Sequence, residues 1–302
     1  MIEHIVSSQL NHVPLSILIP TFMRDAVLWN TISDLKPQLR SQDEILIIDQ
    51  NSPALLPPPE LQASWLRLIH LDTPSLTRAR NLGIESCKHE IMVFLDDDIV
   101  PGKDLLDQIR RLSIEKPNRI LTGIVDQEDK PEGVPTPGLV NLKNGDIRTN
   151  FSRPILGPVP FFPGCLSVIP KSCLPPVPFF CPAFRGASQG EEIDFALRVQ
   201  ARGVQIEADP SIRIYHLKVV EGGCRSPEFR NRFFLDQVYN QSFFFGRHGE
   251  LLNLFSFLKR QKGFVEFYSR LPGHKSHSLK IILSAMIHLS TGLWLGISQR
   301  KI

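Results

Sequence analysis

Apolar residues fall into short and nearly unbroken runs along the first third of the chain. The runs cover residues 15–19, 44–49, 66–71 and 91–95, and the last of them leads straight into three aspartates. Runs of this length that do not alternate with polar residues are typical of strands buried on both faces of a parallel sheet. We therefore predict four such strands.

Between these runs, apolar residues recur at the spacing of an amphipathic helix. The pattern covers residues 25–39, 76–87 and 103–112. It places apolar side chains on one face of each segment, and that face can pack on a sheet. The alternation of strand and helix predicts an α/β protein with a mostly parallel, Rossmann-like sheet flanked by helices.

The second half of the chain has a different pattern. Residues 126–182 are rich in proline and glycine, which favours loops and short strands around a pocket over long helices. A helix is expected from about residue 190 to 203, and a strand over 206–214. An aromatic-rich helix is expected over 225–245.

We expect a main domain, residues 1–220, and a helical C-terminal extension, residues 221–302. From residue 255 onward the extension carries eight Lys or Arg residues and a single acid, Glu266, whereas the whole chain has a net charge of only +3. This basic end indicates either contact with an anionic partner, such as a membrane surface, or a solvated basic face. The apolar run 281–297 is short for a membrane span and contains polar residues, so we expect a packed or interfacial helix.

Composition narrows the class of protein. Hydrophobic residues make up 42% and charged residues 22% of the 302 residues, which are values of a globular protein. The small net charge does not favour nucleic-acid binding. The five cysteines form no CxxC pair, and residues 1–14 lack the pattern of a signal peptide. We therefore expect a reducing, cytoplasmic compartment, either free in it or peripheral at the inner face of the membrane.

Polar residues follow three of the predicted strands. They are Pro-Thr-Phe-Met-Arg at 20–24, Asp-Gln-Asn-Ser at 49–52, and Asp-Asp-Asp at 96–98. Ligands of parallel α/β sheets gather beyond the carboxyl ends of the strands. We therefore expect these three segments to form one site.

The aspartates at 96–98 are the sharpest chemical feature of the sequence. In an extended segment Asp96 and Asp98 point to the same side, and Asp97 points to the other. Carboxylates are the ligands that Mg²⁺ and Mn²⁺ prefer, often together with substrate phosphates. A solvated acidic loop, or a charge cap for the helix near residue 103, is the alternative reading.

Three other features carry possible chemistry. Arg78 and Arg80 suit a diphosphate, although surface arginines on an ordinary helix would look the same. The acids Glu191 and Glu192 open a predicted helix, where they either favour the helix dipole or supply a general base. His216 follows the strand at 206–214 and is either structural or a ligand.

Taken in order, these motifs resemble those of the family 2 glycosyltransferases, which have the GT-A fold, over about residues 14–216. The resemblance implies a role for each motif. Residues of the nucleotide-sugar site would be Pro20, Thr21, Phe22, Arg24, Asp49, Arg78, Arg80, Asn81, Asp96 and Asp97. Asp49 is similar to the acid that reads the base. Asp96, Asp98 and His216 are similar to the family's metal ligands, which implies Mg²⁺ or Mn²⁺ as the cofactor.

The resemblance also assigns the acceptor side. Gly164 lies in a segment similar to the acceptor loop, and the resemblance assigns Asp194 to the acceptor site as well. Glu191 and Glu192 are similar to the catalytic acidic pair, with Glu192 as the base. The family often has Glu-Asp there, so the longer second side chain is a departure from its pattern.

The function that the resemblance implies is metal-dependent, inverting transfer of a sugar from a nucleotide-diphosphate sugar. The acceptor would be a hydroxyl of a glycan, a lipid-linked or another molecule, as in polysaccharide biosynthesis. Two alternatives stay open. The segment 94–100 also fits a haloacid-dehalogenase-type phosphatase with Asp96 as nucleophile. The chain could also be a non-catalytic module that binds a sugar nucleotide.

Overall fold

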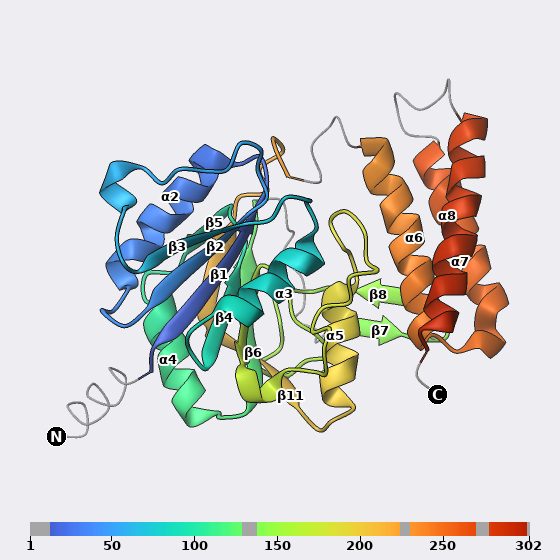
Figure 1. The fold of residues 1–302 in the computed structure, drawn as a ribbon. Coiled ribbons are helices and arrows are strands. Elements are labelled where there is room, and N and C mark those ends of the chain that lie inside the picture. Colours follow the sequence, from blue (N-terminus) through green and yellow to red (C-terminus); the bar gives the residue numbers. More distant parts are fainter. Residues whose placement is uncertain (1–12, 129–137, 224–229, 270–277, 301–302) are drawn as a thin grey trace.

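The computed structural model describes residues 13–128, 138–223, 230–269 and 278–300. Most of its strands form one sheet (Figure 1). They are β1 (Leu15–Thr21), β2 (Glu44–Asp49), β3 (Leu66–His70), β4 (Ile91–Leu95), β5 (Ile99–Pro101), β6 (Arg119–Asp126), β9 (Gly157–Pro158), β10 (Leu166–Pro170) and β11 (Gln205–His216). Two further strands, β7 (Leu139–Asn141) and β8 (Asp146–Arg148), pair with each other.

The sheet has two halves. Its order is β3-β2-β1-β4-β10-β6-β11-β5, with β9 paired to β11. The half from β3 to β4 is parallel throughout, as its apolar runs predict. In the other half β10 is antiparallel to both of its neighbours, which the sequence pattern did not reveal.

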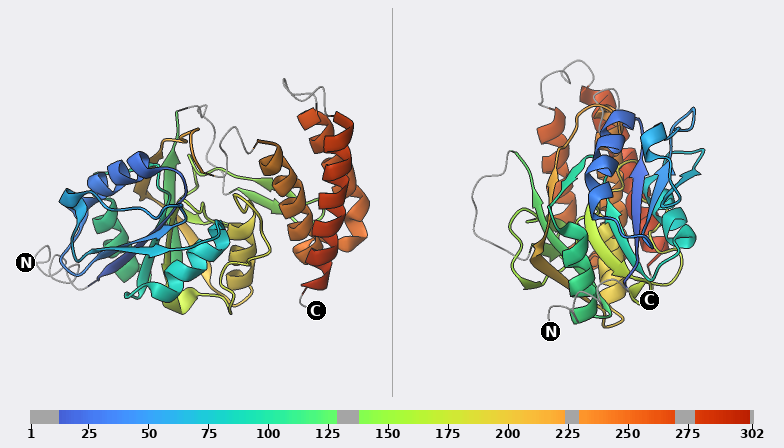
Figure 2. Two further views of the ribbon diagram at one scale, coloured as in Figure 1. Left: turned by 45° about the horizontal axis from the view of Figure 1, so that its top comes forward. Right: turned by 90° about the vertical axis from the view of Figure 1, so that its left-hand side faces the viewer.

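Helices cover both faces of the sheet (Figures 1 and 2). They are α2 (Asp25–Leu35), α3 (Leu76–Ser86), α4 (Leu105–Glu115) and α5 (Glu191–Gln200). Alternate strand residues explain the layers: Ile17 packs with α2 and α4 in one core, and Leu18 packs with α3 and α5 in the other. Strands buried on both faces need apolar residues at nearly every position, so the predicted α/β fold is confirmed.

The remaining described helices lie at one end of the molecule beside β7 and β8 (Figure 2). They are α6 (Arg230–His248), α7 (Leu254–Ser269) and α8 (Ser278–Ser298), with short 3₁₀ turns at Lys36–Gln38, Pro59–Leu61, Lys171–Cys173 and Leu251–Asn253. Glycines bring α6 and α8 close together, because a Cβ at Gly246, Gly292 or Gly296 would meet the backbone of the other helix. The C-terminal helix expected over 281–297 is therefore packed along one face.

Aromatic side chains join these helices to the main body. Tyr239, Phe243 and Phe244 of α6 belong to the same core as the α5 face of the sheet. Within the described parts of the chain, no helix combines the length and the apolar character that a membrane crossing requires. A domain boundary near residue 220 stays a prediction.

Candidate active site

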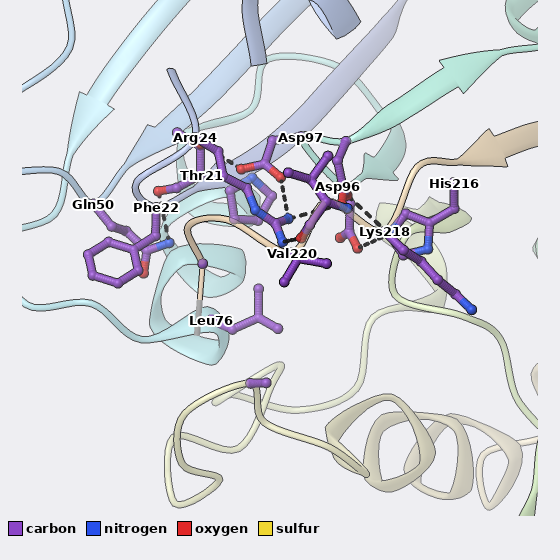
Figure 3. A pocket seen from close by; sticks show the side chains of 15 residues that line it. Thr21, Phe22, Arg24, Gln50, Leu76, Asp96, Asp97, His216, Lys218 and Val220 are labelled. Carbon is purple, nitrogen blue, oxygen red and sulfur yellow. Dashed lines mark hydrogen bonds and ion pairs between the residues drawn. The ribbon is translucent and has the colours of Figure 1, made fainter. Parts of the chain in front are cut away.

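A cavity of about 350 Å³ lies beyond the carboxyl ends of β1, β2 and β4 (Figure 3). We call it the edge cavity. All three polar segments that follow the predicted strands contribute to it, which confirms that topology brings them together. Its lining residues are Pro20, Thr21, Phe22, Arg24, Gln50, Leu76, Asp96, Asp97, Asp98, Ala187, His216, Lys218, Val219, Val220 and Gly223.

Two aspartates and one histidine converge at this cavity. Asp96, Asp98 and His216 each offer a ligand atom, and these atoms all lie within 4.8 Å of one another. The Nε2 atom of His216 is 3.0 Å from Asp98 Oδ1 and 3.8 Å from Asp96 Oδ2. Oxygen ligands together with an imidazole nitrogen suit Mn²⁺ or Mg²⁺, so this group could hold such a cation.

Asp97 points away from that group. Its Oδ2 atom accepts a hydrogen bond of 2.7 Å from the Thr21 hydroxyl on β1 (Figure 3). Burial raises the pKa of Asp97 to about 6, against the opposing effects of Arg24 and Thr21. Asp96 and Asp98 therefore share a side and Asp97 points to the other, as predicted, although the backbone bends at Asp97 and Asp98.

Arg24 links the aspartates to one another. Its Nη1 atom lies 3.1 Å from a carboxylate oxygen of Asp97 and 3.1 Å from one of Asp98. Burial alone would raise the pKa of Asp98, but His216 and Arg24 offset it and hold that pKa below its ordinary value. Asp98 is thus kept ionised, as a cation ligand must be.

The segment after β11, residues 217–223, closes over the cavity and was not predicted. Asp98 accepts backbone hydrogen bonds from it, at Oδ2 from the Val219 N–H (3.1 Å) and at its carbonyl from the Leu217 N–H (2.9 Å). Arg24 donates to the carbonyl oxygen of Val219 at 2.6 Å. Gly222 has a positive φ of 72°, and a side chain there would collide with the Met23 carbonyl. Only a contact between distant segments reveals this role, and the local sequence carries no sign of it.

Asp49 is not among the lining residues. It is 1% exposed, and its carboxylate accepts hydrogen bonds from the N–H groups of Asn51 (2.9 Å) and Leu55 (2.7 Å). Its neighbour Gln50 lines the cavity instead and accepts a hydrogen bond of 2.7 Å from the Ser75 N–H. Asp49 thus shapes the loop at the end of β2, and its role in reading a base stays a prediction.

Three residues of α3 that were predicted to bind the nucleotide sugar lie in different surroundings. Arg80 is buried and forms an ion pair with Glu191, and Gly164 leaves room for its guanidinium. Asn81 exchanges two hydrogen bonds of 2.8 Å with the backbone of Phe180. Arg78 is exposed and lines a separate cavity. The structure therefore places these three residues, predicted to bind the nucleotide sugar, outside the edge cavity.

Glu192 lines a second cavity of about 380 Å³, which we call the Glu192 cavity. Its walls include Thr149, Phe161, Gln189 and Gln241. Buried Cys165 lies within the electrostatic reach of Asp96, Asp98 and Glu192, and burial raises the pKa of its thiol well above the ordinary value. The two cavities are neighbours along the chain at the 187–189 segment, where Ala187 lines the edge cavity and Gln189 the Glu192 cavity.

The Asp194 side chain points to α6. It is 0% exposed and lies 2.9 Å from Arg247 Nε and 2.7 Å from His248 Nε2, both on α6. Neither cavity wall includes it. Asp194 therefore joins α5 to α6, and a direct contact with an acceptor gains no support from this arrangement.

Comparisons with known proteins agree with this architecture. The family model described as glycosyl transferase family 2 matches residues 16–174. No curated protein matches the chain. A crystal structure of GalNAc-T7 with UDP, GalNAc and Mn²⁺ is 13% identical, has a TM-score of 0.53, and aligns over 85% of this chain and 57% of that one. This chain thus spans less than two thirds of that protein's length.

A second solved structure is more distant. It is the mannosyltransferase PcManGT from Pyrobaculum calidifontis in complex with GDP-Man and Mn²⁺, at 12% identity over 93% of this chain and 83% of that chain. Its TM-score of 0.49 is too low to bear on the fold.

Proposed function

Because this chain belongs to the family 2 glycosyltransferases and has the GT-A fold, we propose that it transfers a sugar from a nucleotide-diphosphate sugar to an acceptor hydroxyl, with inversion at the anomeric carbon. One observation carries the proposal. Asp96, Asp98 and His216 converge at a cavity on the carboxyl edge of the parallel strands. That place suits a nucleotide, and that ligand set suits a divalent cation.

The ligand set is consistent with Mg²⁺ or Mn²⁺ in chemical terms. Asp98 stays ionised, and Asp96, which is 33% exposed, faces the cavity where substrate oxygens would complete the coordination. Once bound, the cation would offset negative charge that develops on the leaving nucleoside diphosphate. Arg24 holds Asp98 in place, and segment 217–223 forms part of the cavity wall.

We assign the general base to Glu192. The acceptor would enter the Glu192 cavity, where the carboxylate takes the proton of its hydroxyl as the oxygen forms a bond to the anomeric carbon. The bond from that carbon to the diphosphate oxygen breaks on the opposite face, so the configuration inverts. Glu191 supports this arrangement from the α5 start through its ion pair with Arg80.

The direct test is a panel of UDP-, GDP- and dTDP-sugars, offered with Mn²⁺ or Mg²⁺ and a set of glycan and lipid-linked acceptors. We expect cation-dependent release of nucleoside diphosphate from one donor. Release of inorganic phosphate from phosphate esters would instead support the phosphatase alternative at Asp96. Cation-dependent binding of a donor with no turnover on any acceptor would support the non-catalytic module.

The C-terminal helices favour a second property, contact with a membrane surface. Several side chains on one side of α8 are exposed although apolar, among them Met286 (62%), Ile287 (64%) and Trp294 (71%). On α7, Lys259 and Lys262 are exposed cations. Apolar and basic side chains on one helical unit suit the surface of an anionic bilayer. We therefore propose peripheral attachment at the inner face of a membrane.

Vesicle sedimentation tests the membrane contact. The chain should bind phosphatidylcholine vesicles that contain phosphatidylserine more tightly than phosphatidylcholine alone. Ile287→Ser with Trp294→Ser should weaken that binding, and Ile155→Ser, at an exposed residue of the main body, should not. Equal binding by all three proteins would count against the proposal.

A further inference from the structure

A third cavity, of about 490 Å³, lies between the first turn of α3, segment 182–186, α6 and α8. We call it the basic cavity. Its charged lining residues are Arg78, Arg185, Arg232 and Asp236, and His288 adds a titratable ring. In the described part of the chain, Asp236 is the only acid that lines it. Three guanidinium groups against one carboxylate leave the cavity with a net positive charge.

Asp236 does not neutralise the arginines by close pairing. It is 8% exposed, and its nearest ion-pair contact is 3.9 Å, to Arg232 Nε. Burial raises the pKa of Asp236 in spite of Arg232, Arg185 and His288. The arginines therefore have no close anionic partner at this carboxylate, and their net positive charge favours an anion from outside.

Arg185 is held in position before any ligand arrives. Its backbone N–H and carbonyl exchange two hydrogen bonds of 2.9 Å with the buried Asn240 side chain on α6. Its guanidinium lies over the Tyr239 ring, with Cζ 3.6 Å from the ring centre. Stacking fixes the plane of the group. Such a preorganised fork matches phosphate oxygens.

The basic cavity adjoins the edge cavity and lies on the same chain segment as the Glu192 cavity. Ser75 lines the basic cavity, and the next residue, Leu76, lines the edge cavity. Likewise, Gly186 lines the basic cavity and Ala187 lines the edge cavity. Further along, Gln189 lines the Glu192 cavity. The segment from 185 to 192 therefore touches all three in turn. An anion in the basic cavity would be anchored next to the place where the sugar is transferred.

We propose that the basic cavity binds a phosphate or diphosphate group of the acceptor, an assignment that rests on the proposed transferase function. The edge cavity has its own cation ligands and Arg24 for the donor, and Arg78 does not line it. The acceptor would thus be an anionic compound whose reactive hydroxyl lies apart from its phosphate.

Binding of inorganic pyrophosphate, measured by calorimetry in EDTA, tests the proposal. We expect saturable binding by the full chain that weakens at least about tenfold in Arg185→Gln and in Arg78→Gln, since each removes charge-assisted hydrogen bonds. Arg78 is exposed, so its variant does not depend on core packing. Arg148→Gln, at a side chain that is 74% exposed and outside this cavity, should bind like the unaltered protein.

Asp98→Asn separates the two anion sites. It should leave pyrophosphate binding in EDTA unchanged but abolish binding of nucleoside diphosphates with Mn²⁺, which the arginine variants should retain. Absence of pyrophosphate binding, or binding that ignores both arginines, would overturn the assignment. If pyrophosphate binding follows the arginines but no nucleoside diphosphate binds with Mn²⁺, the proposed transferase function fails and the anion site stands.

Vesicles distinguish the source of the phosphate. With phosphatidylcholine vesicles that contain phosphatidic acid, a lipid with a phosphate monoester headgroup, weaker binding by Arg185→Gln would indicate a lipid-borne group. Unchanged vesicle binding alongside weaker pyrophosphate binding would indicate a soluble phosphorylated acceptor.

Discussion

The two acidic clusters of this chain look alike in sequence and differ in space. Residues 96–98 connect β4 to β5 through a bend at Asp97 and Asp98, and two of their carboxylates meet His216 at the edge cavity. Residues 191–194 open α5, and their three carboxylates separate: Glu191 pairs with Arg80, Glu192 lines its own cavity, and Asp194 pairs with α6. One cluster concentrates negative charge, and the other distributes it.

Backbone geometry explains the difference. Side chains alternate in an extended segment, so residues two apart share a side. On a helix each residue turns by about 100°, so neighbouring acids face different partners. The cluster between β4 and β5 is therefore suited to holding one cation, and the helical cluster to placing a single carboxylate at a substrate while the others fix the helix. The five cluster variants below test this division of roles.

Asp98→Asn should have the largest effect. It removes a cation ligand that also contacts His216, Arg24 and the Val219 N–H. Because a bound cation contributes several kcal/mol of charge stabilisation, we expect transfer to fall about ten-thousandfold. Steady-state kinetics and Mn²⁺ titration measure it. The matched control is Asp72→Asn, at a 96% exposed side chain, which should retain full activity. Cation-dependent transfer at the normal rate in Asp98→Asn would contradict the metal assignment.

Glu192→Gln should lower transfer by about a thousandfold, which is the usual contribution of a general base. Unlike Asp98→Asn, it should act on kcat and leave the KM of the donor and the affinity for Mn²⁺ unchanged. Glu191→Gln is the comparison within the same cluster. It breaks the pair with Arg80 and should cost stability, seen as a lower melting temperature. If Glu191→Gln lost turnover while Glu192→Gln kept it, the base would be Glu191.

The part of the site at the ends of the parallel strands was predictable, because the sequence pattern that reveals it lies in short contiguous segments. Buried parallel strands require unbroken apolar runs, and cavity-lining residues lie at or just beyond their ends, as Thr21, Arg24 and Asp96 do. The direction of Asp97 also followed from strand alternation.

The remainder depends on contacts between distant parts of the chain. Arg80 is near Glu191 only because α3 and α5 pack on the same face of the sheet. The 217–223 segment contacts the site through a hydrogen bond from Arg24 to the Val219 carbonyl. Arg247 of α6 forms an ion pair with Asp194. Residue types alone could not reveal these partners: Arg80, Asn81 and Asp194 were expected at a substrate, and the structure shows each of them paired within the protein.

Asp194→Asn should mainly weaken the fold. It removes the charge that faces Arg247 and His248 in a fully buried setting, and breaking a buried pair from one side costs about 3–5 kcal/mol. Urea unfolding measures the loss. Asp126→Asn is the matched control, since Asp126 pairs with Arg213 at a partly exposed position and should change stability by less than about 1 kcal/mol. Equal losses in the two variants would mean that Asp194 does not anchor α6.

Asp97→Asn should have the smallest effect, and its effect should depend on pH. Burial raises the pKa of Asp97 to about 6 in the folded protein, from an ordinary 3.8. The folded state therefore holds this proton more tightly than the unfolded state does. Its contribution to stability is complete below about pH 4 and is lost as the pH rises through about 6.

Asparagine has no proton to lose, so the variant escapes that loss. In EDTA, the unfolding free energy of the unaltered protein should fall relative to Asp97→Asn by about 1–3 kcal/mol between pH 4 and pH 7. Urea unfolding at a series of pH values gives the difference curve, and acids that titrate in both proteins cancel from it. Asp72→Asn should run parallel to the unaltered protein, because its side chain is 96% exposed. If Asp97→Asn runs parallel as well, Asp97 is already ionised at low pH and is held by Arg24 and Thr21 more firmly than burial opposes.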